Sequence, residues 1–296
     1  MGFSRSLAAG QVSRIQVFDV RSGTSRVVHV DHAVLLEAPN WTSTGDLVLN
    51  GDGLLWRMPA DGSTPPSIVL LEGLPELNND HVLSPDRATV YMSANDGHLY
   101  AAPVGGGAVR RVTAPAAHWH FLHGVSPDGE RLAYVALDPE DGWDSGTLHI
   151  VGVDGAGDRA VTAGRGPDDG PEFDPTGEWV YFNTERFSAT PGHAQIARIR
   201  PDGTGLEQLT FDDRVNWFPH LDPTGRFAVY LSFPPGTTGH PADREVRLHL
   251  VDGAADADAW EDATVAVELD GGQGTINVNS WSPDGTRFAF VDYPVG

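Results

Sequence analysis

One motif recurs along the chain and constrains its fold more than any other feature: a polar turn of the form Ser/Asp-Pro-Asp/Thr-Gly, followed by an apolar run. Six copies align, at residues 40–50, 81–93, 123–136, 171–183, 219–231 and 279–291. Proline presets φ for a turn and glycine takes the position with positive φ, so each copy is expected to be two strands joined tightly. The equivalent positions are Ser43, Pro85, Pro127, Pro175, Pro223 and Pro283, with spacings of 42, 42, 48, 48 and 60 residues. Spacings of about 40–50 residues are typical of β-propeller blades.

A second hairpin pattern lies between these turns, at residues 54–63, 98–113, 147–162 and 195–210. Each repeat unit therefore holds four strands, as a propeller blade does. The sixth unit has its first hairpin at 277–293, and its outer hairpin is expected from the other end of the chain, at 14–30. We predict an all-β, six-bladed β-propeller that forms a single domain over 1–296. Its last blade is built from about 1–32 and 272–296, which leaves no free sheet edge.

The composition excludes several classes of partner. The 41 acidic residues against 19 basic ones give a net charge of −22, which disfavours nucleic acids and anionic membranes. Solubility is the simplest reason for this acidity, and cation binding by some carboxylates is the alternative. The chain has no cysteine, no apolar run of membrane-spanning length and no secretory signal pattern, so we expect a cytoplasmic protein.

The Ser/Asp-Pro-Asp/Thr-Gly repeat resembles the propeller of TolB-like proteins over essentially the whole chain. It is distantly similar to that of the oligogalacturonate lyases, cytoplasmic propeller enzymes of pectin breakdown. The resemblance implies the propeller fold. Neither the accessory domain nor the periplasmic signal of TolB itself is seen in the sequence, so an envelope role is not expected.

Polar side chains gather just before the repeated turns. In a propeller the first strand of each blade lines the central channel, and these side chains are expected at one channel mouth. A water-filled channel and a ligand pocket both accommodate them, and the number of histidines and carboxylates favours the pocket. The set comprises Glu37, Asn40, Asn78, Asn79, Asp80, His81, His118, His120, His123, Asp168, Asp169, Glu172, Asn216, His220, Gln273, Asn277 and Asn279.

The resemblance to the lyases implies a metal site made of a Gln, an H-x-H pair that enters the last blade, and another His. Gln273 is retained, but Asn277-Val278-Asn279 replaces the H-x-H, and asparagine offers only a hard oxygen, so this site does not carry over. A different site is predicted instead, for one divalent ion (manganese, zinc or calcium). Its ligands, which are also the predicted catalytic residues, are His81, His123, Glu172 and His220.

Two inserted loops, at 185–195 and 233–245, are expected to open on the same face and cap a bound molecule, with ordinary surface loops as the alternative. Their arginines suit a substrate carboxylate. Trp217 suits stacking on a sugar ring, with a place in the core as the alternative. The predicted ligand-binding residues are Glu37, Asn40, Asn79, Asp80, Asp169, Arg186, Asn216, Trp217, His240, Arg244, Gln273 and Asn277.

Neither a G-x-S-x-G nucleophile motif nor a Walker phosphate loop is present, so no nucleotide cofactor is expected. Two functional hypotheses remain. The first is a propeller that binds a small carbohydrate or uronate-like ligand at the channel mouth, with metal-assisted β-elimination as its possible chemistry. The second is a non-catalytic scaffold for protein interactions that uses the propeller rim. The sequence does not fix the oligomeric state.

Overall fold

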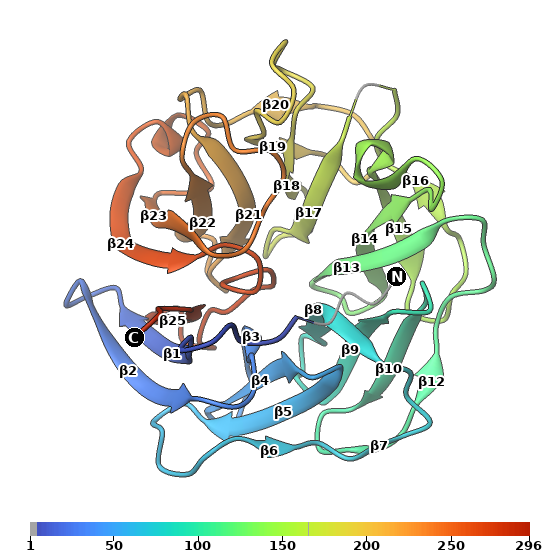
Figure 1. Ribbon diagram of the computed structural model, residues 1–296. Coiled ribbons are helices and arrows are strands. Elements are labelled where there is room, and N and C mark those ends of the chain that lie inside the picture. Colours follow the sequence, from blue (N-terminus) through green and yellow to red (C-terminus); the bar gives the residue numbers. More distant parts are fainter. Residues whose placement is uncertain (1–4, 165) are drawn as a thin grey trace.

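The computed structural model describes residues 5–164 and 166–296, and it is an all-β propeller of six blades, as predicted (Figure 1). Blades 1 to 5 are four-stranded antiparallel sheets whose strands follow one another outward in chain order. Blade 1 comprises β3 (Glu37–Trp41), β4 (Asp46–Gly51), β5 (Leu54–Pro59) and β6 (Ser67–Ile68). Blade 2 comprises β8 (Leu77–Leu83), β9 (Thr89–Ala94), β10 (Leu99–Pro103) and β12 (Arg110–Arg111).

The next three blades repeat this order. Blade 3 comprises β13 (Trp119–Val125), β14 (Arg131–Leu137), β15 (Thr147–Gly152) and β16 (Arg159–Ala160). Blade 4 comprises β17 (Asp168–Phe173), β18 (Val180–Thr184), β19 (Gln195–Ile199) and β20 (Glu207–Gln208). Blade 5 comprises β21 (Val215–Leu221), β22 (Phe227–Phe233), β23 (Arg244–Asp252) and β24 (Thr264–Gly271).

A few short elements lie outside the blade pattern. A parallel two-stranded ladder joins the outer parts of blades 1 and 2, made of β7 (Leu71–Glu72) and β11 (Gly107–Ala108). The described helices are two 3₁₀ turns, η1 (Gly142–Ser145) and η2 (Asp258–Trp260). Neither has the length or hydrophobicity of a membrane-spanning helix.

The geometry of the repeated turn explains why either Ser or Asp occurs at its first position. The side-chain oxygen of this residue accepts the backbone N–H five residues on, as Ser126 does from Arg131 at 2.9 Å and Asp222 from Phe227 at 2.7 Å. Its backbone carbonyl meanwhile accepts the N–H three residues on, for example from Gly129 at 2.8 Å. A short side chain with an acceptor oxygen is therefore required, and both residue types supply one.

The last blade closes the ring with strands from both ends of the chain, as predicted. Its sheet has the order β2 (Thr24–Asp31), β1 (Ser13–Asp19), β25 (Arg287–Asp292), and the blue strands lie beside the red one in Figure 1. The β1–β25 ladder is antiparallel and runs from the Arg14–Asp292 pair to the Asp19–Arg287 pair. Apolar residues of β1 enter the cores on both sides: Ile15 packs toward blade 1 and Phe18 toward blade 5.

The innermost segment of this blade differs from the prediction. The sequence pattern predicted a hairpin over 277–293, but residues 272–286 form no regular strand, and a single bridge joins Trp281 to Phe288. Hydrogen bonds from β25 to this segment are sparse, with Ala289 N–H donating to Ser280 O and Val291 N–H to Thr275 O. The segment is thus free to leave the sheet and turn toward the axis.

Candidate functional site

The irregular segment of blade 6 crosses the channel. His220, on β21, donates from Nε2 to the carbonyl of Ile276 at 2.7 Å. His123, on β13, donates from Nδ1 to the carbonyl of Asn277 at 3.1 Å. Blade 3 lies opposite blade 6 in a ring of six, so this bond spans the channel, and the red segment lies near the centre of Figure 1. We call residues 272–281 the channel plug.

A buried cluster of hydrogen bonds around Glu172 and His220 joins blades 4, 5 and 6. Glu172 Oε2 lies 2.6 Å from His220 Nδ1, while Glu172 Oε1 accepts the Leu221 N–H at 2.9 Å and the Asn279 side-chain amide at 2.7 Å. The indole N–H of Trp281 donates to the carbonyl of His220 at 3.0 Å. Both carboxylate oxygens and both ring nitrogens are thus used within the protein, so this cluster is a structural brace.

In the part of the chain that the structure describes, no three of the four predicted metal ligands offer atoms that all lie within 4.8 Å of one another. Both ring nitrogens of His220 already have partners, Glu172 and the Ile276 carbonyl. The same holds for His123, whose nitrogens lie against the Asn277 carbonyl and Asp169. His81 is fully buried, its Nδ1 paired with Asn50 of blade 1, and burial lowers its pKa to about 4. Among the described residues, the three-residue group whose potential ligand atoms all approach within 4.8 Å is a different one: His118, His120 and Asp158.

A cavity of about 540 Å³ opens at the channel mouth formed by the inserted loops, between blades 3, 4 and 5. It is large enough for a small organic ligand. Four predicted ligand-binding residues line it: Asp169, Trp217, His240 and Gln273. Its remaining wall includes Trp143, Asn183 and Glu185.

Aromatic rings form one side of this cavity. His240 lies between two indoles, with ring centroids 4.5 Å from Trp217 and 5.6 Å from Trp143, both edge-on. Trp143, in η1, is 48% exposed, whereas Trp217 is buried. The buried indole N–H of Trp217 has no hydrogen-bond partner among the described residues.

Trp143 was not among the residues predicted from the sequence to form the site. It lies on the loop between the second and third strands of blade 3, which is the same loop position as the inserted segments singled out in blades 4 and 5. A tryptophan in an otherwise acidic, polar loop (138–145) was the available signal.

A chain of ionisable groups leads from the cavity into the channel. Asp169 Oδ1 lies 3.2 Å from His123 Nε2, and Asp169 Oδ2 lies 3.7 Å from His240 Nε2. Burial alone would raise the pKa of Asp169, but the hydrogen bond and charge of His123 lower it on balance. Burial would lower the pKa of His123, but Asp80 and Asp169 raise it to about 9. His123 is therefore an imidazolium near neutral pH, held between two carboxyls.

Two further carboxyls of the channel, Glu37 and Asp80, have raised pKa values. Burial raises the pKa of Glu37 to about 7, although Arg5 Nη1 lies 2.8 Å from it. Burial and the charge of Asp169 raise the pKa of Asp80 to about 6, against the charge of His123. Clustered, buried carboxyls with raised pKa values are typical of functional sites. Asn79 and Asn277 line a smaller void of about 30 Å³ beside Asp80.

Four other predicted ligand-binding residues lie elsewhere. Asn40 lines a cavity of about 280 Å³ at the opposite mouth, among the proline turns. Arg186 is bound to Asp168 and therefore unavailable to a ligand carboxylate. Asn216 is buried and bonded to Thr210, Asp212 and Ser232, so it fixes a loop. Arg244 is exposed at the start of β23.

Known proteins resemble this chain over almost its full length. An uncharacterized protein of Agrobacterium fabrum is 36% identical over 287 residues, which are 95% of this chain and 92% of that protein. The structure of a putative TolB from Agrobacterium tumefaciens superimposes with a TM-score of 0.85 at 35% identity, covering 96% of this chain and 99% of the other.

A manganese complex of an oligogalacturonate lyase shares the fold alone, with a TM-score of 0.56 at 13% identity over 95% of this chain and 75% of the other. No family model matches the chain. The full-length similarity at 35–36% identity and the shared six-bladed architecture lead to one conclusion: the chain belongs to the TolB-like β-propeller family.

Proposed function

We propose that the protein binds a small, uncharged, hydroxyl-rich molecule of the carbohydrate type in the 540 Å³ cavity between blades 3, 4 and 5. The observation that carries this proposal is the composition of the cavity wall, where the exposed ring of Trp143 lies together with polar side chains.

The walls of the cavity suit such a ligand. The exposed ring of Trp143 offers an apolar face for the C–H side of a sugar ring. Asp169, Asn183 and Glu185 line the cavity with side chains that accept hydrogen bonds from hydroxyl groups. Apolar and polar side chains thus line the same cavity, and a pyranose presents both kinds of surface.

The charge balance disfavours the uronate expected from the sequence. Arg186 is bound to Asp168, and Arg5 is bound to Glu37 and to the carbonyl of Gln273. Carboxylates therefore dominate the remaining polar wall, and a ligand carboxylate would meet repulsion there. An uncharged ligand avoids this cost.

Proton abstraction is a second candidate function, and one observation favours it. Burial lowers the pKa of His240 despite the nearby charge of Asp169, so the imidazole is neutral and able to accept a proton at the cavity wall. With an oxidised glycoside, His240 would remove the proton next to the ketone. The C–O bond at the β-carbon would then break, and the departing alkoxide would take up a proton. This candidate retains the β-elimination of the sequence hypothesis without requiring an anionic substrate.

Calorimetry and tryptophan fluorescence with neutral mono- and disaccharides, and with digalacturonate for comparison, test the binding proposal. We expect neutral sugars to bind more tightly than digalacturonate, and Trp143→Ala to weaken binding at least tenfold. Phe211→Ala is the matched control, because Phe211 is 61% exposed and does not line the cavity. Equal affinities in the two variants, or binding of digalacturonate alone, would contradict the proposal.

For catalysis, release of the leaving group from a 3-keto-glycoside is the assay. His240→Asn should reduce the rate by at least about 100-fold if His240 is the base. An unchanged rate would exclude this role while leaving ligand binding intact.

The scaffold alternative rests on another surface. Leu70 is 79% exposed, and it adjoins Leu54 and Ile68 around a groove of about 320 Å³ beside blades 1 and 2. If the protein is a scaffold, Leu70→Ser should abolish partner capture while sugar binding stays unaffected. The cytoplasmic location stays a prediction.

A further inference from the structure

A second cluster of ionisable side chains lies in the seam between blades 2 and 3, away from the 540 Å³ cavity. Four of the twelve histidines meet there with a tyrosine and an aspartate. The ring centroids of His118 and His120 are 4.7 Å apart, and those of His118 and His149 are 5.3 Å apart. His98 stacks on His120 from the blade 2 side, with centroids 6.0 Å apart. The sequence had placed His118 and His120 at the channel mouth, whereas the structure turns both away from it.

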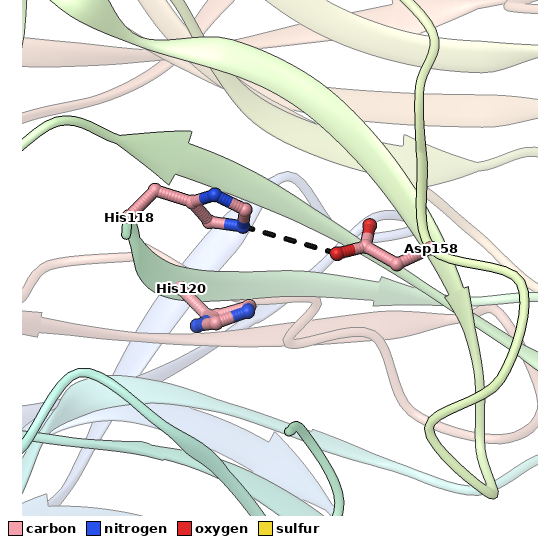
Figure 2. Close-up of side chains that lie close together, drawn as sticks. All are labelled: His118, His120 and Asp158. Carbon is pink, nitrogen blue, oxygen red and sulfur yellow. Dashed lines mark ion pairs between the residues drawn. The ribbon is translucent and has the colours of Figure 1, made fainter. Parts of the chain in front are cut away.

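Three side chains in this seam converge as metal ligands do. His118, His120 and Asp158 each offer an atom, and these atoms all lie within 4.8 Å of one another (Figure 2). His118 Nε2 and Asp158 Oδ2 are 3.8 Å apart. Ligand atoms in a tetrahedral zinc site lie roughly 3.3–3.5 Å apart, because metal–ligand distances are about 2.0–2.2 Å. Asp158 is exposed just before β16, so a small rotation of its carboxylate closes the difference.

His120 is already oriented as a ligand. It is 2% exposed, and its Nδ1 donates to the carbonyl of Gly97 at 2.7 Å. In the neutral ring this bond fixes the hydrogen on Nδ1 and leaves the lone pair on Nε2, for which the described residues show no hydrogen-bond partner. A backbone carbonyl that holds the far nitrogen of a histidine is the usual outer support of a metal-bound imidazole.

Asp158 is supported in the same way. The Tyr134 hydroxyl donates to its Oδ1 at 2.6 Å, and His149 Nδ1 lies 3.1 Å from the same oxygen. Oδ2 remains directed toward His118. The carboxylate is thus fixed by one oxygen and offers the other.

We propose that His118, His120 and Asp158 bind a divalent ion of the zinc class in the seam between blades 2 and 3. Two imidazole nitrogens and one carboxylate oxygen suit zinc, and the exposed side of Asp158 leaves the fourth position open to water. The ion joins the start of β13, the innermost strand, to the residue that precedes β16, the two-residue outermost strand. It therefore fastens the outer edge of blade 3 to its inner strand.

Zinc titration of chelator-treated protein against a chromophoric competitor, with elemental analysis, tests this site. A chain with net charge −22 attracts divalent ions weakly at many places, so stoichiometry and the response of variants decide the result. We expect one tightly bound zinc per chain and a rise in melting temperature with zinc. His118→Ala and Asp158→Asn should each lower the affinity at least tenfold.

The chain contains a matched control in blade 5. His249 is paired across the strands with Tyr230, as His149 is with Tyr134, and its ring stacks on that tyrosine. His249→Ala should leave zinc affinity unchanged, because blade 5 does not repeat the His118–His120 pair. The proposal is overturned if wild-type protein binds no stoichiometric zinc, if neither ligand variant weakens binding, or if His249→Ala weakens it equally.

Discussion

Glu172→Ala should destabilise the propeller far more than its position at the channel suggests. The substitution removes the acceptor of three donors: the Leu221 N–H, the Asn279 side-chain amide and Nδ1 of His220. Leu221 N–H and His220 are buried, whereas the partly exposed amide of Asn279 can turn to water. A buried donor left without a partner costs about 1–3 kcal/mol, and the substitution leaves two of them, the Leu221 N–H and Nδ1 of His220. We therefore expect a loss of about 2–6 kcal/mol in the free energy of unfolding.

Two variants separate the causes. Glu172→Gln keeps an oxygen for Leu221 and Asn279, and its amide can donate to His220 while Nε2 still donates to Ile276, so we expect a cost of about 1 kcal/mol. Glu178→Ala, on the exposed turn of the same blade, should change stability by less than about 0.5 kcal/mol. Urea unfolding followed by circular dichroism gives these values from midpoint and slope. A loss below about 1 kcal/mol for Glu172→Ala would refute the brace and reopen a functional role for Glu172.

Two further predictions concern closure and pH. Removing residues 1–31 takes away β1 and β2, exposes the edge of β25 and opens the hydrophobic cores on both sides of β1. The shortened protein should be insoluble or show no cooperative thermal unfolding by circular dichroism, and an unchanged unfolding curve would refute closure by the N-terminal strands. The pKa of His123 in the folded state is raised to about 9, above its reference value of about 6.5. Protonated His123 therefore contributes at most ~3 kcal/mol to the free energy of unfolding. This contribution is complete below pH 6.5 and is lost as the pH rises through 9. Urea midpoints should fall between pH 7 and 9.5, and this fall should be shallower in Asp169→Asn; a flat wild-type profile would contradict the assignment.

The fold was predictable because the repeated turn is determined locally. Proline, an acceptor side chain and a positive-φ residue specify each turn whatever the rest of the chain does. Two copies depart from this pattern. Blade 1 has Ser43 in place of the proline. In blade 2, Arg87 takes the glycine position at φ 57°, and its guanidinium donates to the carbonyl of Trp41 in the neighbouring blade. At this turn the hydrogen bond from Arg87 to blade 1 occurs together with a positive φ, which arginine rarely adopts.

The site was less predictable, because each inner strand of blades 1 to 5 contains a register shift. His81 and His123 both lie four residues before the proline of their turn, so the repeat predicted the same height and direction for both. His81 is paired with Met92 and faces blade 1, but His123 falls in the bulge between Leu122 and Gly124 and faces the channel. A one-residue shift reverses the face of every later side chain, and nothing in the repeat marks where the shift falls.

The channel plug is the segment in which this chain departs from the pattern that the lyase resemblance implied. The resemblance to the lyases implied imidazole ligands where this chain has Asn277 and Asn279. Asn277 Oδ1 instead accepts the Gly274 N–H at 2.8 Å, and Asn279 donates to Glu172. These amides hold the plug in place across the channel. The space left for a ligand is therefore beside His240 and under the inserted loops, and it is there that variants should be directed.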